Sequence, residues 1–309
     1  MRVVCIGECM VELRQAGDEL YARSFAGDAY NTAVYLKRSA PRAEVSLLTV
    51  TGDGGLSAAM RADWLGEGVD DRLAFTAAGA EPGLYMIELS ATGERSFRYW
   101  RSASPARRWF SRMIADGAAD RLAGADLVYL SGISLAILPP EDQQRAIQWL
   151  SMLKGRVGRI AFDPNVRPAL WPDLPTARRV IEPIFAIADI LRASREDGAL
   201  LYGLDDPTAQ IDAFRCAGAG EIALTLDAEG CMLSTDAGVV TLPAPVVGDV
   251  RDTSGAGDSF NGAYLAARLL GAAPLGAARA GLQVAARVVT HAGAIVPATV
   301  SHPLAPPPK

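Results

Sequence analysis

The sequence predicts an α/β protein with one mainly parallel central sheet, helices on both of its faces and a small additional β-sheet. Short continuous apolar runs alternate with segments of helical periodicity, as expected where crossover helices join parallel strands. One segment, 84–101, breaks this pattern by alternating in period two. The strands are expected at 2–7, 45–50, 127–132, 159–163, 188–194 and 221–226, and helices at 29–40, 55–68 and 141–155.

The first run, RVVCIG at 2–7, is apolar and ends in glycine, as a strand buried on both faces does. The later runs are of the same kind. In sheets of this class, ligands usually bind beyond the carboxyl ends of the strands. The polar motifs described below follow these strands or lie in the exceptional segment, so we expect them to gather at one edge of the sheet.

The exceptional segment is expected to form an antiparallel hairpin around a glycine-containing turn. Alternation places Phe97, Tyr99 and Arg101 on one face of it. Such a hairpin cannot lie inside a parallel sheet, so we expect it to project as a lid. The second part of 11–28 is expected to pair with it.

The composition fits one large globular domain. Half of the 309 residues are apolar and 21% are charged. We expect a single domain over 1–300, with a lid of about 11–28 and 82–104 inserted into it, and a proline-rich tail at 301–309. The net charge of −5, without a basic cluster, argues against a nucleic-acid partner. Neither a signal peptide nor an apolar run of about 20 residues occurs, so we expect no membrane partner and a cytoplasmic location.

The stretch DTSGAGDSF at 252–260 carries the chemistry. Apolar positions at helical spacing follow it, so a helix should begin near Asp258, preceded by a loop of Gly255, Ala256 and Gly257. Small residues and free N–H groups at a helix start attract an anion, and Asp258 adds a proton acceptor beside it. Phosphoryl transfer needs such a pair. Taken alone, the small-residue loop is better interpreted as a tight turn with Asp258 as a cap, and a helix start lowers the basicity of a carboxylate.

This stretch resembles the late signature of the ribokinase-like (PfkB) carbohydrate kinases, and the resemblance covers nearly the whole chain. GECMVEL (7–13), FAGDAYNTAVYL (25–36) and FDPNVRPALW (162–171) are similar to earlier motifs of that family. The resemblance implies a ribokinase-like fold and ATP and Mg²⁺ as cofactors. It also implies that Asp258 is the catalytic base and that the 255–257 loop is the anion hole.

Within the family, the segments 82–88, 92–106 and 129–138 resemble the 2-keto-3-deoxygluconate kinases. The resemblance implies phosphorylation of the terminal (C6) hydroxyl of that sugar acid, giving 2-keto-3-deoxy-6-phosphogluconate. An arginine pair, Arg101 with Arg167, suits the carboxylate of a sugar acid. The implied substrate-binding residues are Gly27, Asp28, Asn31, Tyr85, Tyr99, Arg101, Arg167, Asp252 and Asp258.

Several of these residues have structural alternatives when each is considered alone. Asp28 can cap the helix at 29–40, Tyr85 can be a core aromatic, Arg167 can form an ion pair, and Asp252 can stabilise a turn. Three other functions stay open: a kinase for a neutral ketose such as fructose, a non-catalytic sugar-acid-binding relative, and a nucleoside kinase. The family also implies a homo-oligomer formed through the lid.

The nucleotide side departs from the family pattern. SRED at 194–197 stands where the family has NxxE, so a water-mediated magnesium contact is expected at Asp197, or at Glu196 beside it. LTLDAEGC at 224–231 stands where many relatives read VKxGxxG, and Thr225 therefore replaces a lysine. The nucleotide-binding residues expected are Ser194, Thr225, Gly230, Gly255 and Gly257. His291 either borders the adenine or is structural.

Overall fold

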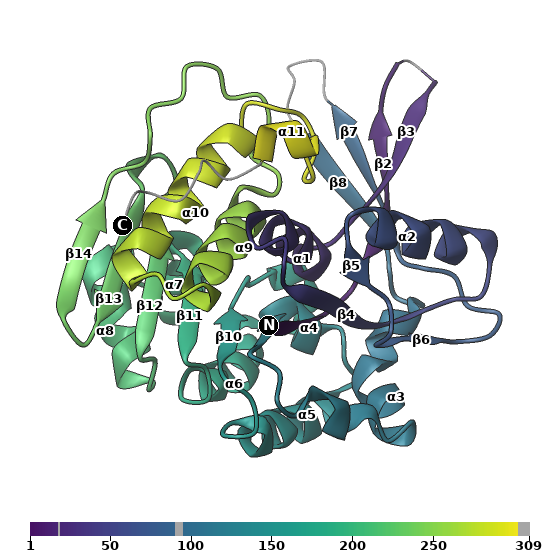
Figure 1. The fold of residues 1–309 in the computed structure, drawn as a ribbon, viewed down its shortest axis with the longest axis horizontal. Helices are drawn as coiled ribbons and strands as arrows, with labels where there is room; N and C mark the ends of the chain where they lie inside the picture. Colours follow the sequence, from purple (N-terminus) through teal and green to yellow (C-terminus); the bar gives the residue numbers. More distant parts are fainter. Residues whose placement is uncertain (18, 90–94, 302–309) are drawn as a thin grey trace.

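The six apolar runs form the core of the central sheet in the computed structural model, which describes residues 1–17, 19–89 and 95–301. Within these residues the strand order is β14-β13-β12-β11-β10-β9-β1-β4-β5, and β6 pairs with β4 (Figure 1). β13 is antiparallel to both of its neighbours, and the other pairs are parallel. The strands are β1 Arg2–Ile6, β4 Glu44–Thr51, β5 Val69–Asp70, β6 Ala74–Thr76, β9 Leu127–Ser131, β10 Ile160–Asp163, β11 Ile190–Ser194, β12 Glu221–Thr225, β13 Cys231–Thr235 and β14 Gly238–Leu242.

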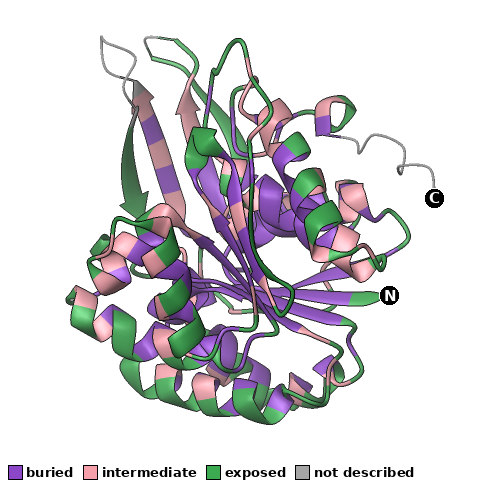
Figure 2. Cartoon of the chain, turned by 90° about the vertical axis from the view of Figure 1, so that its left-hand side faces the viewer, coloured by how far each residue is buried: buried purple, intermediate pink, exposed green. Residues whose placement is uncertain are grey.

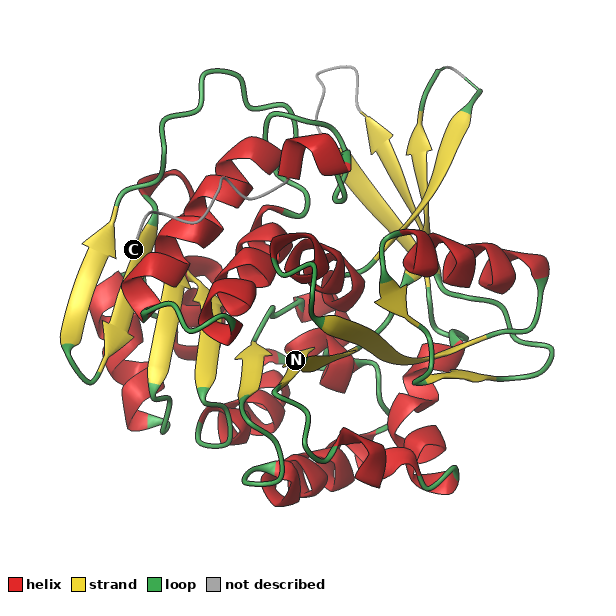
Figure 3. Cartoon of the chain, viewed as in Figure 1, coloured by secondary structure: helices red, strands yellow, loops and turns green. Residues whose placement is uncertain are grey.

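Helices cover both faces of this sheet (Figure 3), which confirms the predicted fold class. One face packs on α1 Asp28–Ser39, α2 Gly55–Gly66, α9 Ala256–Leu269 and α10 Pro274–Val288. The other face packs on α3 Trp109–Ala115, α4 Gly132–Ala136, α5 Pro140–Leu153, α6 Leu174–Phe185, α7 Arg195–Tyr202 and α8 Pro207–Cys216. Because each face is covered, the six predicted strands are buried almost along their whole length (Figure 2). This explains why they read as continuous apolar runs.

Local sequence explains where several helices begin. Pro140 opens α5 and is followed by two acidic residues in the first turn, which suits the free N–H groups and the positive end of the helix dipole. Asp173 caps α6 by accepting from Thr176 N at 2.6 Å, and Asp206 caps α8 by accepting from Ala209 N at 2.8 Å. These helices therefore start where the chain supplies a partner for their first N–H groups.

A second, four-stranded sheet stands away from the first, in the order β3-β2-β7-β8 (Figure 1). Its strands are β2 Met10–Gln15, β3 Tyr21–Ala26, β7 Leu84–Leu89 and β8 Arg95–Trp100. The hairpin predicted at 84–101 is present as the antiparallel pair β7–β8. The predicted partner of this hairpin is wrong. The first part of 11–28, as β2, runs parallel to β7, whereas the second part, β3, pairs with β2.

The last described element is α11, Ala298–Ser301. Apart from Ser301, the proline-rich segment expected at 301–309 lies outside the described residues. Among the described helices, none has the length and apolar character needed to cross a bilayer. The division into a domain at 1–300 and a functional lid stays a prediction.

Candidate active site

The carboxyl ends of the parallel strands and the second sheet bring the polar motifs together. Glu8 follows β1, Asn165 follows β10 and the start of α7 follows β11. The helix α9 contributes the 252–260 stretch to the same edge, because it packs against α1. The site is therefore assembled from segments that are more than 200 residues apart in the sequence.

The 252–260 stretch forms a tight loop that leads into α9. Gly255 is the N-cap and has a φ of 72°, a left-handed conformation that disfavours other residues. Asp252 holds the loop: Oδ1 accepts from Ser254 N at 2.7 Å and Oδ2 accepts from Gly293 N at 2.8 Å. The helix begins at Ala256, two residues before the predicted start near Asp258. Ala256 N donates to Thr253 O at 3.2 Å, so the N–H groups nearest the helix start are not equally available to a ligand.

Asp258 lies in the first turn of α9 and faces α1. Asn31 Nδ2 donates to Asp258 Oδ2 at 2.8 Å. Burial, and after it the negative charge of Asp28, raise the pKa of Asp258 to about 7, whereas the Asn31 hydrogen bond and Arg167 act to lower it. The sequence argument that a helix start makes this carboxylate less basic is therefore outweighed by burial. A carboxyl group with a pKa near 7 is suited to accepting a proton at neutral pH.

Asn31 connects the start of α1 to Asp258. Its Oδ1 accepts from Gly27 N at 3.2 Å, while its amide nitrogen contacts the carboxylate. Gly27 is the N-cap of α1, and a Cβ there would collide with the carbonyl oxygen of Glu8. Asp28 makes no capping hydrogen bond in α1. It accepts from Asn165 Nδ2 at 3.2 Å and so faces the loop after β10.

A buried polar cluster beneath these groups was not predicted from the sequence. Asn261 Nδ2 donates to Asp163 Oδ2 at 2.7 Å, and the Asn261 side-chain oxygen accepts from Arg192. Burial raises the pKa of Asp163 to about 6, although Arg192 acts to lower it. Asp163 also accepts from Asn165 N at 3.1 Å, which helps to hold the backbone of Asn165 at a φ of 35°. The cluster thus ties α9 to the end of β10.

The second sheet contributes aromatic rings and an arginine. The Tyr85 hydroxyl donates to Glu12, and the Tyr85 ring stacks on that of Tyr99 with centroids 5.7 Å apart. Tyr85 is buried, whereas Tyr99 is 53% exposed. Arg101 lies just beyond β8, where its guanidinium forms an ion pair with the buried carboxylate of Glu8. Of the three predicted lid residues, Tyr85 and Arg101 are therefore held by acidic residues that sequence reasoning did not single out.

Arg167 belongs to the central sheet's side of the site, in the loop after β10. Its Nη1 donates to Val166 O at 3.4 Å, and among the described residues it has no ion-pair partner. Its charge lowers the pKa of Asp258 and also opposes the rise that burial causes in the pKa of Tyr99. Arg167 is thus electrostatically coupled both to the α9 carboxylate and to the second sheet. The structural ion pair considered from the sequence is not formed within the described part of the chain.

The predicted nucleotide side centres on the ends of β11 and β12, where Ser194 pairs with Thr225 in register. Ser194 caps α7 and donates to Asp197 Oδ2 at 2.6 Å. Asp197 is buried, and its other oxygen accepts from Val166 N at 2.7 Å. The neighbouring Glu196 is exposed. Gly230 lies in the turn between β12 and β13, where it donates to Asp227 O at 3.3 Å.

No group of three or more histidine, cysteine or acidic side chains within the described ranges is arranged to hold a metal ion. Both oxygens of Asp197 already accept hydrogen bonds from the protein. Glu196 has a carboxylate that faces solvent, so it suits a water-mediated contact better.

Two hollows lie outside this cluster. One, of about 400 Å³, is lined by 245–248 and by Gln283, Ala286, Arg287 and Thr290. It borders the 252–260 loop, because Asp252 N donates to Val289 O at 3.1 Å. His291 lies beside it, and its Nδ1 contacts Thr290 Oγ1 at 2.8 Å.

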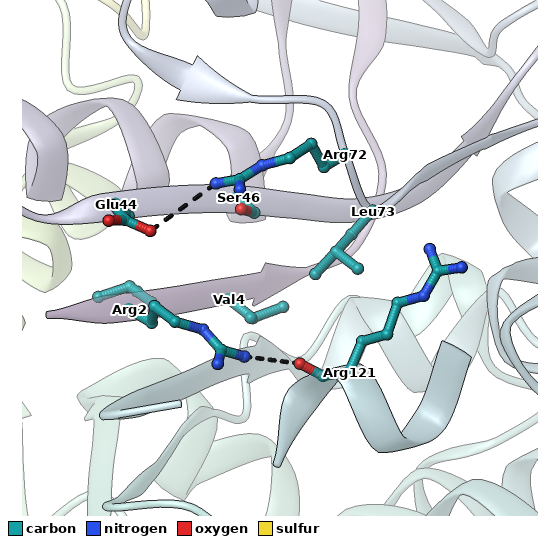
Figure 4. Close-up of a pocket in the computed structure, with 8 residues that line it drawn as sticks. Arg2, Val4, Glu44, Ser46, Arg72, Leu73 and Arg121 are labelled. Carbon is teal, nitrogen blue, oxygen red and sulfur yellow. Dashed lines mark hydrogen bonds and ion pairs between the residues drawn. The ribbon is translucent and has the colours of Figure 1, made fainter. Parts of the chain in front are cut away.

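The other hollow, of about 360 Å³, lies at the opposite edge of the sheet, where β1 and β4 begin (Figure 4). Arg2, Arg72 and Arg121 line it together with Glu44. The predicted site lies beyond the carboxyl ends of the parallel strands, whereas this hollow lies at their amino ends. This hollow therefore plays no part in the cluster around Asp258.

Comparison with known proteins identifies the family. The model of the pfkB family of carbohydrate kinases matches residues 1–300. The chain belongs to this family. It is 38% identical over 301 residues to the 2-dehydro-3-deoxygluconokinase of Dickeya dadantii and 36% identical to that of Escherichia coli. The alignments cover 96% of this chain in both cases, and 96% and 97% of those proteins.

Solved structures of PfkB-like kinases share the fold. The aminoimidazole riboside kinase of Salmonella enterica, in complex with aminoimidazole riboside and an ATP analogue, superposes with a TM-score of 0.82. It is 21% identical, and the match covers 97% of this chain and 96% of that one. At this identity the likeness supports the ribokinase-like architecture and not the substrate.

Six residues of the cluster were not singled out from the sequence: Glu8, Glu12, Asp163, Asn165, Arg192 and Asn261. Glu8, Asp163 and Asn165 lie inside quoted motifs, yet only the neighbouring arginine, glycine and aspartate residues were assigned roles. Arg192 had a visible signal: an arginine inside the apolar run ADILRAS needs a partner.

Proposed function

We propose that this PfkB kinase transfers the terminal phosphoryl group of ATP to the C6 hydroxyl of 2-keto-3-deoxygluconate, also called 2-dehydro-3-deoxygluconate. The observation that carries the proposal is the pairing of Asp258 with Asn31 at the start of α9, directly behind the glycine loop. Full-length similarity to several 2-dehydro-3-deoxygluconokinases supports the substrate.

Asp258 is the proposed base. Asn31 would orient the Asp258 carboxylate toward the substrate hydroxyl. A pKa of about 7 lets Asp258 accept the proton as the phosphoryl group is transferred. Gly255 and Gly257 leave room for that group beside the first-turn N–H groups, which would stabilise its charge. Ala256 would join them once its N–H leaves Thr253 O.

The sugar acid would lie between α1, the second sheet and the loop after β10. Arg167 is the proposed partner of the carboxylate, and Arg101 would share it while remaining paired with Glu8. Gly27 and Asp28 at the start of α1, with Asn31, would contact the hydroxyls. Tyr85 and Tyr99 would cover the sugar with their stacked rings. Asp252 would act indirectly, since its two oxygens hold the loop.

ATP would bind beyond the ends of β11 and β12, with its base in the hollow beside Thr290 and its phosphates toward Gly255 and Gly257. Ser194, Thr225 and Gly230 would line this path. Mg²⁺ would arrive with the phosphates and neutralise part of their charge, with Glu196 or Asp197 contacting its waters.

The lid is also proposed to mediate homo-oligomerisation. Trp100 is 53% exposed on β8, on the face opposite Tyr99, which leaves an apolar surface on the outside of the second sheet. Burial of that surface against a second copy would remove it from water. The number of subunits and the cytoplasmic location stay predictions.

The test is turnover in a coupled ADP-release assay with 2-keto-3-deoxygluconate, its galactonate epimer, fructose, ribose and adenosine, with and without Mg²⁺. We expect magnesium-dependent turnover that is highest on the sugar acids. Asp258→Asn should lose at least about 10³-fold in kcat while still binding ATP, because the base is removed and its shape is kept. Preference for fructose would replace the substrate assignment. Absence of turnover on every compound would overturn the kinase assignment in favour of a sugar-acid-binding protein.

A further inference from the structure

Arg192 is a buried cation in the central sheet. It lies on β11, between strands that are otherwise apolar, and is 2% exposed. Burial of a charge is costly unless other groups satisfy it, so an arginine at such a position is expected to have a specific role. No carboxylate within the described residues forms an ion pair with it.

The guanidinium is held in place by neutral groups. Its Nη1 donates to Ala193 O at 2.7 Å, to Ala223 O at 3.1 Å and to Thr225 Oγ1 at 3.1 Å. Its Nε donates to the side chain of Asn261. The group also lies over the ring of Phe260, 4.7 Å from the centroid. These contacts fix the position of the charge, and the nearby carboxylate of Asp163 reaches it only through Asn261 and through its field.

The charge lies directly beneath the glycine loop. A Cβ built on Gly257 would be 3.8 Å from Arg192 Nη2. Asn261 and Phe260, which contact the guanidinium, belong to the first turns of α9 that follow Asp258. The field of Arg192 therefore adds to that of the helix N-terminus at the place where the transferred phosphoryl group is proposed to lie.

The partner Thr225 is a neutral residue at the end of β12. Arg192 contacts its hydroxyl from the adjacent strand, since β11 and β12 pair in parallel. The site thus holds a cation on β11 that contacts a neutral hydroxyl on β12. Had Thr225 been lysine, two cations would meet at this point, with a repulsive cost.

We propose that Arg192 is the positioning residue that supplies, from β11, the positive charge that Thr225 does not provide on β12. It holds the start of α9 through Asn261 and raises the electrostatic potential at the glycine loop, and so favours the nucleotide phosphates and the transferring group. This proposal rests on the proposed kinase function and deepens it. It commits to the phosphate side of the site and not to the sugar-acid side.

The test removes the positive charge from β11 and places one on β12 instead. Arg192→Met should raise KM for ATP and lower kcat, with a combined loss of at least about 30-fold in kcat/KM for ATP and a change below about threefold in KM for the sugar acid. Arg192→Met/Thr225→Lys should recover at least about a third of the loss in log(kcat/KM) for ATP that Arg192→Met causes. The matched control Arg192→Met/Thr225→Met adds similar length without charge and should recover nothing. Melting temperatures of the three proteins report on folding.

Equal activity of the lysine and methionine double variants would overturn the proposal, as would an Arg192→Met enzyme with wild-type kcat/KM for ATP. If Arg192→Met does not fold, Arg192→Lys and Arg192→Gln decide in its place. The lysine variant should keep at least tenfold more kcat/KM for ATP than the glutamine variant, and equal values would reject the electrostatic role. Wild-type turnover on the sugar acid is measured in the same assay, so failure of the kinase assignment is separately visible.

Discussion

At the scale of single residues, the site is defined by acidic groups with unequal partners. Asp258 has one neutral hydrogen-bond donor and the negative charge of Asp28 nearby, whereas Glu8 is paired with a cation. Burial raises the pKa of each. The consequences differ. Asp258, which has no ion-pair partner among the described residues, has a pKa close to neutral pH, whereas the charge state of Glu8 depends on Arg101.

The pH dependence of turnover should report Asp258. The base must be ionised, so kcat/KM for the sugar acid should fall about tenfold per pH unit below pH 7, as set by the pKa of the free enzyme. Asp28→Asn removes the second cause of the raised pKa and should move this acid limb to lower pH. Asp28→Glu keeps the charge and serves as the control. An acid limb at the same pH in both variants would show that another group controls the profile.

The Glu8–Arg101 pair makes a simple alanine test of Arg101 misleading. Arg101→Met leaves Glu8 buried beside an apolar group, and loss of one partner of a buried pair costs about 3–5 kcal/mol. We expect Glu8→Gln/Arg101→Met to be at least about 1 kcal/mol more stable than Arg101→Met in urea unfolding at pH 7.5. Both should have a raised KM for the sugar acid. If the double variant regains wild-type KM, Arg101 does not contact the substrate carboxylate.

At the scale of elements, most strands were predictable because burial on both faces leaves an apolar signature in sequence. The edge strand β14 was missed, since Gly238–Leu242 is largely exposed and carries no such signature. The pairing of the second sheet was wrong for a related reason. Alternation identifies a hairpin, but the choice of partner between β2 and β3 depends on how the chain leaves β1, which local pattern does not encode.

Prediction of the site was limited in the same way, because local sequence does not show which distant segments meet. The loop and base of α9 and the arginines after β8 and β10 could be named because family motifs mark them. The contacts that hold them join distant segments: Asn31 to Asp258 and Arg192 to Asn261. Such contacts follow from strand order, because β11 and β10 place their ends under α9. Only the fold reveals which motif residues support one another.

At the scale of the whole molecule, the active-site acids should cost stability. The pKa of Asp258 is raised from 3.8 to about 7, so the folded state binds a proton more tightly than the unfolded state does. Between these values, stability therefore falls as pH rises, and above pH 7 the full cost is present. A shift of this size corresponds to at most about 4 kcal/mol.

Asp258→Asn should consequently be more stable than the wild type, although it is inactive. We expect its melting temperature to exceed that of the wild type by about 2 °C or more at pH 8 and the difference to shrink steadily as pH falls toward 4, where the wild-type carboxyl group is protonated. Scanning calorimetry of both proteins at intervals between pH 4 and 8 measures this difference directly. Subtraction of the two curves cancels other titrating groups, since only position 258 differs. A difference that is independent of pH would mean that Asp258 ionises in the folded protein as freely as in the unfolded chain, and the explanation of its basicity by burial would fail.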